Sequence, residues 1–205
     1  MRLTSRQKIL WKLVNKHYRD NQFDASHGID HVERDLKWCE ILIKDELEAN
    51  SEILIPACMC HDMALPFVSD DEHARKAIDY AREVLIEAGY SNNEVAKIDR
   101  AMRQHSFDDK TTDKRTIEGD ILYDADKLDS TGPIGVWRIL YETEIKKFPS
   151  IKECIENYLE ILENLPKYST GKYNGFYTRH GSKLAKQRLP YTISTLKEIL
   201  KDIQD

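Results

Sequence analysis

The chain has 205 residues and a formal net charge of -5, from 31 Lys and Arg against 36 Asp and Glu. This length is sufficient for one hydrophobic core, and no Pro/Gly/Ser-rich linker or shift in composition divides the sequence. The interspersed charges argue against a general nucleic-acid surface, although they allow a local basic pocket or a small anionic ligand. We therefore expect one domain over residues 1–205.

The composition favours helices throughout. Only 8 Gly and 6 Pro occur, and the remaining residues are mostly good helix formers with few signals for hairpins. The first segment, MRLTSRQKILWKLV, mixes charged and apolar residues and predicts neither a secretion signal nor a membrane span. We expect an all-α, cytoplasmic protein without a membrane contact. Its four cysteines, too few for a disulfide scaffold, are expected to be reduced and packed in the core.

Apolar spacing and capping residues predict the helices in chain order. Thr4 or Ser5 begins the first helix, and Asn50 is a candidate cap with Pro56 in or near the first turn that follows. Ser91 and Ser150 each begin a capping box. The run FDDKTTDKRTIEG, residues 107–119, is expected to be a surface loop, and residues 167–179 a second, aromatic loop. The predicted helices cover residues 4–18, 26–47, 51–63, 70–88, 91–106, 121–144 with a break at 131–133, 150–165, 178–189 and 191–203, the last two meeting at Pro190.

Two histidines and two aspartates stand out by their type and order. His61 and Asp62 are adjacent, His31 lies thirty residues earlier, and Asp126 follows within the run DADKLD. Imidazole suits borderline transition metals and carboxylate suits harder ones, so an equal mixture with open positions fits a catalytic divalent ion. Such an ion can lower the pKa of bound water toward about 7 and polarise a phosphorus centre. The pattern predicts a metal-dependent hydrolase acting on a phosphoanhydride or phosphoester.

The same residues resemble those of the HD-domain metal-dependent phosphohydrolases, and in particular the small bacterial HD hydrolases, some of which are nucleotide pyrophosphatases. The matching segments are SHGIDHVERD, ACMCHDM, RQHSF and DADKLDSTGPIGVWR, which together cover about residues 26–138. The resemblance implies a single helical HD domain with a central metal site, completed by C-terminal helices over about residues 149–203. It also implies His31, His61, Asp62 and Asp126 as the ligands of one ion, with Asp124 supporting them.

The chain departs from the family pattern at two positions. Gly28 stands where many relatives have Asp, and Cys60 stands where Leu is frequent. We expect one divalent ion, Mn²⁺ first, with Mg²⁺, Co²⁺, Ni²⁺ and Fe²⁺ as alternatives.

Further residues are candidates for catalysis or substrate binding. His27 would donate a proton or contact a phosphate if the helix of His31 begins early enough. His105 would touch substrate or help to hold a second metal, and Lys127, Arg138 and Arg34 would bind phosphate oxygens. The alternatives are an exposed helix start for His27, a buried hydrogen-bonded position for His105, solvated charge for Lys127 and Arg138, and an ion pair with Asp30 or another acidic neighbour for Arg34. Asp129 would orient a ligand histidine, whereas His73 and His180 are expected at the surface.

Three functions remain to be distinguished. The first is a phosphohydrolase acting on a nucleotide or similar small phosphate compound, in its most specific form converting a nucleoside triphosphate to the monophosphate and pyrophosphate. The second is a di-iron HD oxygenase, which would need His73 and His105 to join the four core ligands. The third is a nucleotide-binding sensor with a structural metal. The aromatic residues of the C-terminal third would serve base stacking, a homodimer contact or the core.

Overall fold

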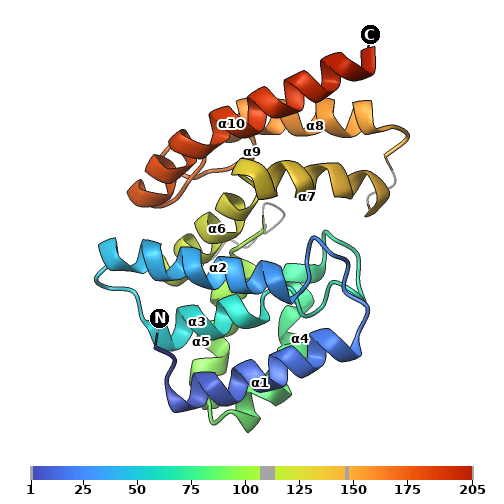
Figure 1. Cartoon of the computed structure of the whole chain (residues 1–205). Helices are drawn as coiled ribbons and strands as arrows, with labels where there is room; N and C mark the ends of the chain where they lie inside the picture. The colour runs from blue at the N-terminus through green and yellow to red at the C-terminus, as the bar shows by residue number, and fades with distance from the viewer. Residues whose placement is uncertain (1, 107–113, 146–147, 205) are drawn as a thin grey trace. The chain divides into compact units, whose positions relative to one another are not determined.

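Helices make up nearly all of the computed structural model, which describes residues 2–106, 114–145 and 148–204 (Figure 1). In these ranges the secondary structure consists of α-helices, one short 3-10 helix and an isolated bridge between Tyr173 and Phe176. The predicted all-α fold is confirmed. The helices are α1 (Ser5–Asp20), α2 (Ile29–Leu42), α3 (Ser51–Cys60), α4 (His73–Glu87), α5 (Asn92–Arg103), α6 (Ile117–Asp129), α7 (Gly132–Ile145), α8 (Ile151–Glu163), α9 (Leu165–Tyr168) and α10 (Arg179–Gln204).

The chain forms two compact units, and α6 runs from the first into the second. The N-terminal unit is Met1–Ala125 and the C-terminal unit is Asp126–Asp205. Each unit is compact by itself, and the expectation of one domain over residues 1–205 stays a prediction. Within the described residues, no helix is both long enough and apolar enough to cross a lipid bilayer.

Helix α3 is the centre of the N-terminal unit. It contacts α1, α2, α4 and α5, and in Figure 1 it lies between α1 and α2. Every residue from Ile53 to Cys60 is buried, so this helix has no polar face, as expected of a central core helix. Cys58 and Cys60 are not in a disulfide and have no exposed surface, as the sequence predicts.

Predicted caps begin three of the helices. Thr4 and Gln7 form a reciprocal capping box at α1, and Ser91 and Glu94 form a second at α5. The side chain of Asn50 accepts from the Glu52 backbone N–H at the start of α3. These side chains satisfy backbone donors that a helix start leaves without an intrahelical partner.

One arginine connects the starts of α3 and α5 to α1. Arg6 forms ion pairs with Glu52 at 2.7 Å and with Glu94 at 2.9 Å. Its guanidinium also lies over the ring of Tyr90, 4.4 Å from the ring centre. The hydrogen bonds of Ser91 to the Glu94 carboxylate, followed by that of Arg6, lower the pKa of Glu94 to about 2.

The structure corrects several predicted boundaries. Pro56 lies inside α3 rather than in its first turn, and Pro190 lies inside α10, which continues through it instead of dividing into two helices. Helix α2 begins at Ile29, so His27 precedes it, and α6 begins at Ile117, before the predicted end of the loop. Residues 107–113 of that predicted loop lie outside the described residues. The sequence pattern alone does not show whether a proline ends a helix or lies within it. Neighbouring side chains can stabilise a helix that lacks one backbone hydrogen bond at the proline.

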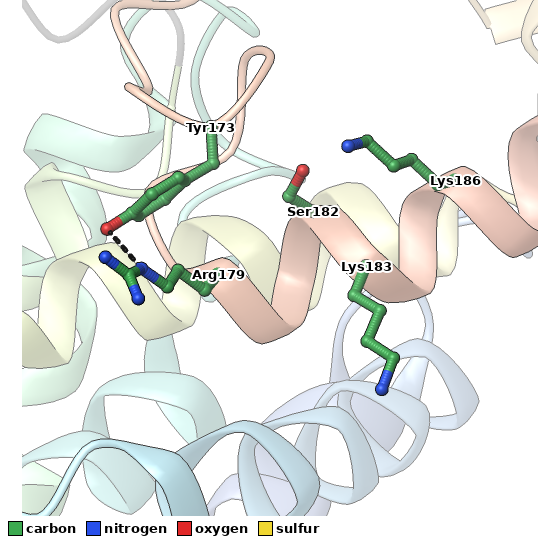
Figure 2. A pocket seen from close by; sticks show the side chains of 5 residues that line it. All are labelled: Tyr173, Arg179, Ser182, Lys183 and Lys186. Carbon is green, nitrogen blue, oxygen red and sulfur yellow. Dashed lines mark hydrogen bonds between the residues drawn. The ribbon is translucent and has the colours of Figure 1, made fainter.

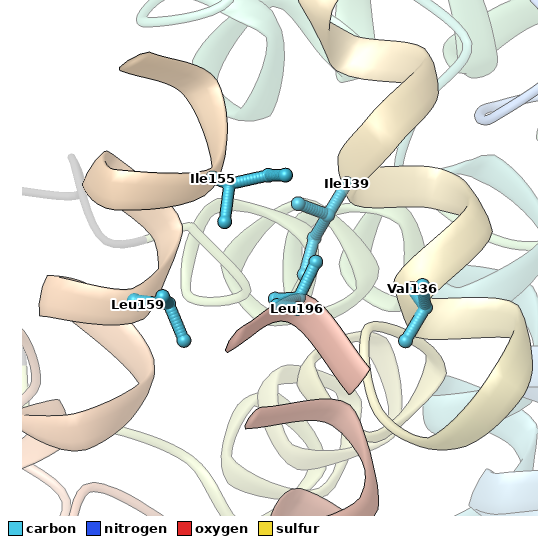
Figure 3. Close-up of a cluster of buried hydrophobic side chains, with 5 residues drawn as sticks. All are labelled: Val136, Ile139, Ile155, Leu159 and Leu196. Atoms are coloured by element: carbon cyan, nitrogen blue, oxygen red, sulfur yellow. The ribbon is translucent and has the colours of Figure 1, made fainter. Parts of the chain in front are cut away.

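The C-terminal unit has its own apolar core. Val136 and Ile139 of α7, Ile155 and Leu159 of α8 and Leu196 of α10 are all buried (Figure 3). Helix α10 packs against α7 and α8, and α7 packs against α8. These five side chains therefore join three helices by apolar burial.

Gly132 starts α7 in the predicted break after α6. Its φ of +73° favours glycine, and a Cβ there would lie 2.6 Å from the guanidinium of Arg188. That guanidinium donates to the carbonyl oxygen of Thr131 at 2.7 Å, while the Gly132 N–H donates to Thr192 at 2.7 Å. The turn is thereby held against α10 within the C-terminal unit.

We predict that Glu94→Gln lowers the free energy of unfolding by about 0.5 kcal/mol near neutral pH, because the ion pair with Arg6 is lost. A lowered carboxylate pKa stabilises the folded state above the unfolded value and loses that effect as the pH falls through the folded value. The difference from wild type should therefore shrink between pH 4.5 and about 2. Urea unfolding at several pH values measures it. Glu83→Gln, at an exposed position of α4, is the control, and a difference independent of pH would contradict the prediction.

Candidate metal centre

Helix α2 presents two ligand-type side chains on its buried face. His31 and Asp35 are one turn apart, and neither has any exposed surface. Nε2 of His31 lies 3.3 Å from Oδ2 of Asp35. Spacing of four residues puts both side chains on the same side of a helix, so Asp35 reaches the site from the same element as His31.

The His61-Asp62 pair follows directly after α3. His61 is the C-terminal cap of that helix and still has helical backbone angles. Its Nε2 lies 3.3 Å from Oδ2 of Asp62 and 3.7 Å from Oδ2 of Asp35. Nε2 of His31 lies 3.5 Å from Oδ2 of Asp62. The N-terminal unit alone thus brings together two histidines and two aspartates.

Two further histidines face the other oxygen of Asp62. Nε2 of His73 lies 3.7 Å from Oδ1, and Nε2 of His105 lies 3.6 Å from the same atom. His73 is the first residue of α4, and His105 follows α5. His73 is 9% exposed, so the expectation that it lies on the surface is wrong: its ring turns inward at the start of α4.

Backbone carbonyl groups fix the rings of three of these histidines. Nδ1 of His61 lies 2.8 Å from the carbonyl oxygen of Cys58, and Nδ1 of His105 lies 2.5 Å from that of Met102. Nδ1 of His73 is hydrogen-bonded in the same way to the carbonyl of Asp70. A carbonyl oxygen only accepts, so each Nδ1 donates, and in a neutral ring the lone pair of Nε2 then points toward the site. Outer hydrogen bonds of this kind are typical of metal-binding histidines.

The distance between the rings of His73 and His105 indicates whether a cation would fit beside them. Their Nε2 atoms are 3.0 Å apart, although in the neutral tautomers just described both are acceptors. Two ligands at right angles around an ion, each about 2.1 Å from it, lie about 3 Å apart. The spacing and the donor atoms are therefore those of a site that holds a cation.

The buried charges support the same conclusion. Burial would raise the pKa of Asp62, but His61, His105 and His31 outweigh it and hold this pKa well below its usual range. Burial lowers the pKa of His105 to about 4, against the opposing effect of Asp62. At neutral pH the carboxylate is therefore ionised and His105 is neutral, which are the forms that bind metals.

The segment that carries His105 is held by its neighbour Gln104. Oε1 of Gln104 accepts from the Thr116 backbone N–H at 2.9 Å, and Arg115 donates to the Gln104 carbonyl at 2.7 Å. A Cβ on Gly119 would lie 2.3 Å from Oε1 of Gln104. Only glycine fits at this point of α6, so the first turn of α6 positions the end of α5.

The other predicted residue of this unit near the ligands is His27. It lies in the turn before α2, with Nδ1 3.1 Å from Oδ2 of Asp24 and 2.9 Å from Oγ of Ser26. Its ring centre is 6.0 Å from that of His31. The catalytic role of His27 stays a prediction, as does substrate binding by Arg34, which is half-buried on α2.

The remaining predicted residues lie in the C-terminal unit. Asp126, at its first position, pairs with Nζ of Lys127 at 2.7 Å, and Arg138 forms a buried ion pair with Asp129 at 2.9 Å. The predicted roles of Asp126 in metal binding and of Lys127 and Arg138 in phosphate binding remain predictions. Asp124, which precedes them on α6, is fully buried.

The sequence analysis did not identify Asp35 as a candidate ligand, and it gave His73 a role at the site only in the di-iron alternative. The signal for Asp35 was its spacing of four residues from His31 within one predicted helix. The sequence held no comparable signal for His73, because the burial of a helix-start histidine depends on what packs over it.

Comparison with known proteins identifies the family. The sequence model of the HD domain family matches residues 28–131, about half of the chain. The chain belongs to the HD domain family. The match includes His31, the His61-Asp62 pair, His105 and Asp126.

Solved structures with low sequence identity share the fold of this HD protein. A Lactobacillus plantarum protein has a TM-score of 0.74 and 20% identity, over 100% of this chain and 99% of its own. A predicted HD superfamily hydrolase from an uncultured Thermotogales bacterium has a TM-score of 0.63 and 21% identity, over 95% and 91%. Bacillus subtilis YpgQ, in complex with ADP, has a TM-score of 0.68 and 17% identity, over 96% and 94%. No curated protein matches this sequence.

We predict that Asp62→Asn lowers the affinity for Mn²⁺ by at least about a hundredfold, since loss of even an outer-shell partner costs ten- to a hundredfold. Titration calorimetry of the metal-stripped protein measures this. Asp79→Asn, an exposed position on α4, is the matched control. Thermal unfolding shows whether the variant is folded, and retention of wild-type affinity in a folded variant would contradict the role of Asp62.

Proposed function

We propose that this HD protein is a metal-dependent phosphohydrolase that acts on a nucleotide or a similar small phosphate compound. In its most specific form it would convert a nucleoside triphosphate to the monophosphate and pyrophosphate. The observation that carries the proposal is the buried Asp62 carboxylate, with Nε2 atoms of His31 and His61 at one oxygen and of His73 and His105 at the other. We expect the protein to act in the cytoplasm.

The relatives support both parts of the proposal. The Thermotogales protein and a Bacillus thuringiensis protein, 21% identical with a TM-score of 0.66, are both described as HD superfamily hydrolases. The ADP in the YpgQ complex shows a nucleotide bound by a protein of this fold. A nucleotide is therefore the first substrate class to test.

The residues have separable tasks in this mechanism. His31, Asp35, His61 and Asp62 would hold a divalent ion, Mn²⁺ first, together with Asp126 as the family pattern implies. Such an ion, when bound, lowers the pKa of water and polarises a phosphoryl group. The hydrogen bonds to backbone carbonyls keep the rings of His61 and His105 oriented before substrate arrives. Preoriented rings require no reorganisation during the reaction.

We propose that His27 moves a proton. Asp24 lies at its Nδ1, and a carboxylate at one ring nitrogen orients the imidazole. His27 would then donate a proton to the leaving group, while Arg34, Lys127 and Arg138 would contact phosphate oxygens.

We predict Mn²⁺-dependent release of phosphate or pyrophosphate from at least one member of a panel of ribo- and deoxyribonucleotides. Asp62→Asn should abolish it, whereas His27→Gln should lower kcat by about a hundredfold with unchanged metal content, because only a proton transfer is removed. Assays of both products measure this. Nucleotide-dependent thermal stabilisation without turnover would contradict the proposal and support a sensor.

The second oxygen of Asp62 favours a second candidate, a site with two ions. His73 and His105 lie at that oxygen with Nε2 atoms 3.0 Å apart, where they could share Asp62 with His31 and His61. A di-iron HD oxygenase needs this pair of histidines, and a hydrolase with two ions would use it equally well.

We predict that this candidate, if correct, gives close to two ions per chain in the protein purified without chelator, and close to one in His73→Gln. Elemental analysis measures both, with His27→Gln as the histidine control. Two irons per chain with oxygen uptake and no phosphate release would identify an oxygenase. One ion per chain in wild type would exclude both two-ion alternatives.

A further inference from the structure

Positive charge is concentrated in one part of an otherwise acidic chain. Between Leu165 and Lys197 the sequence contains seven Lys and Arg and no Asp or Glu, whereas the whole chain carries a net charge of -5. All of these residues belong to the C-terminal unit. A local excess of this kind raises the local concentration of anions.

A pocket of about 450 Å³ lies within this basic run. Tyr173 comes from the loop before α10, and the other lining residues come from the first turns of α10 (Figure 2). The volume is within the range of small-molecule sites. The lining consists of Tyr173, Arg179, Ser182, Lys183 and Lys186.

Tyr173 orients the arginine of this pocket. Nε of Arg179 donates to the hydroxyl oxygen of Tyr173 at 3.2 Å, and the guanidinium carbon lies 5.7 Å from the centre of that ring (Figure 2). The loop around Tyr173 is itself closed, because its N–H donates to the Phe176 carbonyl at 2.9 Å. The fork of Arg179 is therefore held by a defined neighbour, and less side-chain entropy is lost on binding.

Ser182 and Lys186 complete the side of the pocket next to Arg179. Ser182 is 7% exposed, and its hydroxyl has no hydrogen-bond partner among the described residues. In Figure 2 the ammonium group of Lys186 extends toward the side of Ser182, whereas Lys183 points away from the other four residues. Within the part of the chain that the structure describes, Lys183 and Lys186 form no ion pair. An anionic ligand would satisfy the Ser182 hydroxyl and the Lys186 ammonium group together.

We propose that this pocket binds an oligophosphate, that is, two or more linked phosphate groups. The backbone positions of Arg179 and Lys186 are seven residues apart, about 10 Å along the helix, a span that suits linked phosphate groups better than a single one. Arginine binds phosphate oxygens in a fork and lysine binds them as a point charge. The hydroxyl groups of Ser182 and Tyr173 supply further polar contacts to the same oxygens.

The oligophosphate could come from a nucleotide or from an inorganic chain, and both sources share this chemistry. The inference stands apart from the proposed hydrolysis, because every residue that carries it lies between Tyr173 and Lys186 and none is a metal ligand. Binding can therefore be tested in the absence of metal.

The test is titration of the full chain with inorganic tripolyphosphate and, separately, with ATP, in EDTA at low ionic strength. Hydrogen bonds to charged groups are strong enough that Arg179→Gln and Lys186→Gln should each weaken binding about tenfold or more. Lys201→Gln, an exposed lysine on the same helix outside the pocket, has the same charge change and should bind as wild type. Tyr173→Phe should weaken binding less, because it removes one hydroxyl.

Saturable binding that the two pocket variants lose and the control keeps supports the proposal. Tighter binding of ATP than of tripolyphosphate would identify a nucleotide as the source, and equal binding would identify the phosphate chain alone. No binding to wild type, or an equal loss in all three charge variants, would overturn the proposal. These results do not depend on turnover, so an inactive enzyme could still confirm the pocket.

Discussion

The carboxylate of Asp62 is the group on which the N-terminal unit depends. It is 3% exposed, and a carboxylate removed from water is stable only when other groups replace its hydration. Nε2 atoms from four histidines lie around it, two at each oxygen, so a bound cation would replace that hydration for the carboxylate and the ring nitrogens together. The histidines come from α2, the end of α3, the start of α4 and the end of α5. These elements must therefore be in place together.

The ends of the helices orient two of these rings. A helix leaves its last carbonyl groups without intrahelical partners, and Nδ1 of His61 and His105 donate to such carbonyls at the ends of α3 and α5. One hydrogen bond thus satisfies a buried backbone group and fixes the ring nitrogen that faces Asp62. The apolar surface of α3 holds the whole arrangement at the centre of the unit, so core packing and site geometry are coupled.

The C-terminal unit has a different chemical character. Apolar side chains of α7, α8 and α10 form its core, and the run from Leu165 to Lys197 contains seven Lys and Arg and no Asp or Glu. Charge is therefore distributed unevenly along the chain: most candidate ligands for cations belong to the N-terminal unit, whereas the pocket suited to anions belongs to the C-terminal unit. The net charge of the whole chain does not reveal this difference between the two units.

The sequence by itself determined the all-α class, most helix positions, the caps at Thr4, Asn50 and Ser91, and the importance of the His61-Asp62 pair. These features depend on local periodicity, on hydrogen bonds between near neighbours and on an ordered motif, all of which one chain records directly. The tertiary structure decided that α10 continues through Pro190, that Asp35 lies beside His31 and His61, and that His73 is buried against His105. These features depend on which side chains pack across from one another, and sequence spacing does not specify contacts between residues that are distant along the chain.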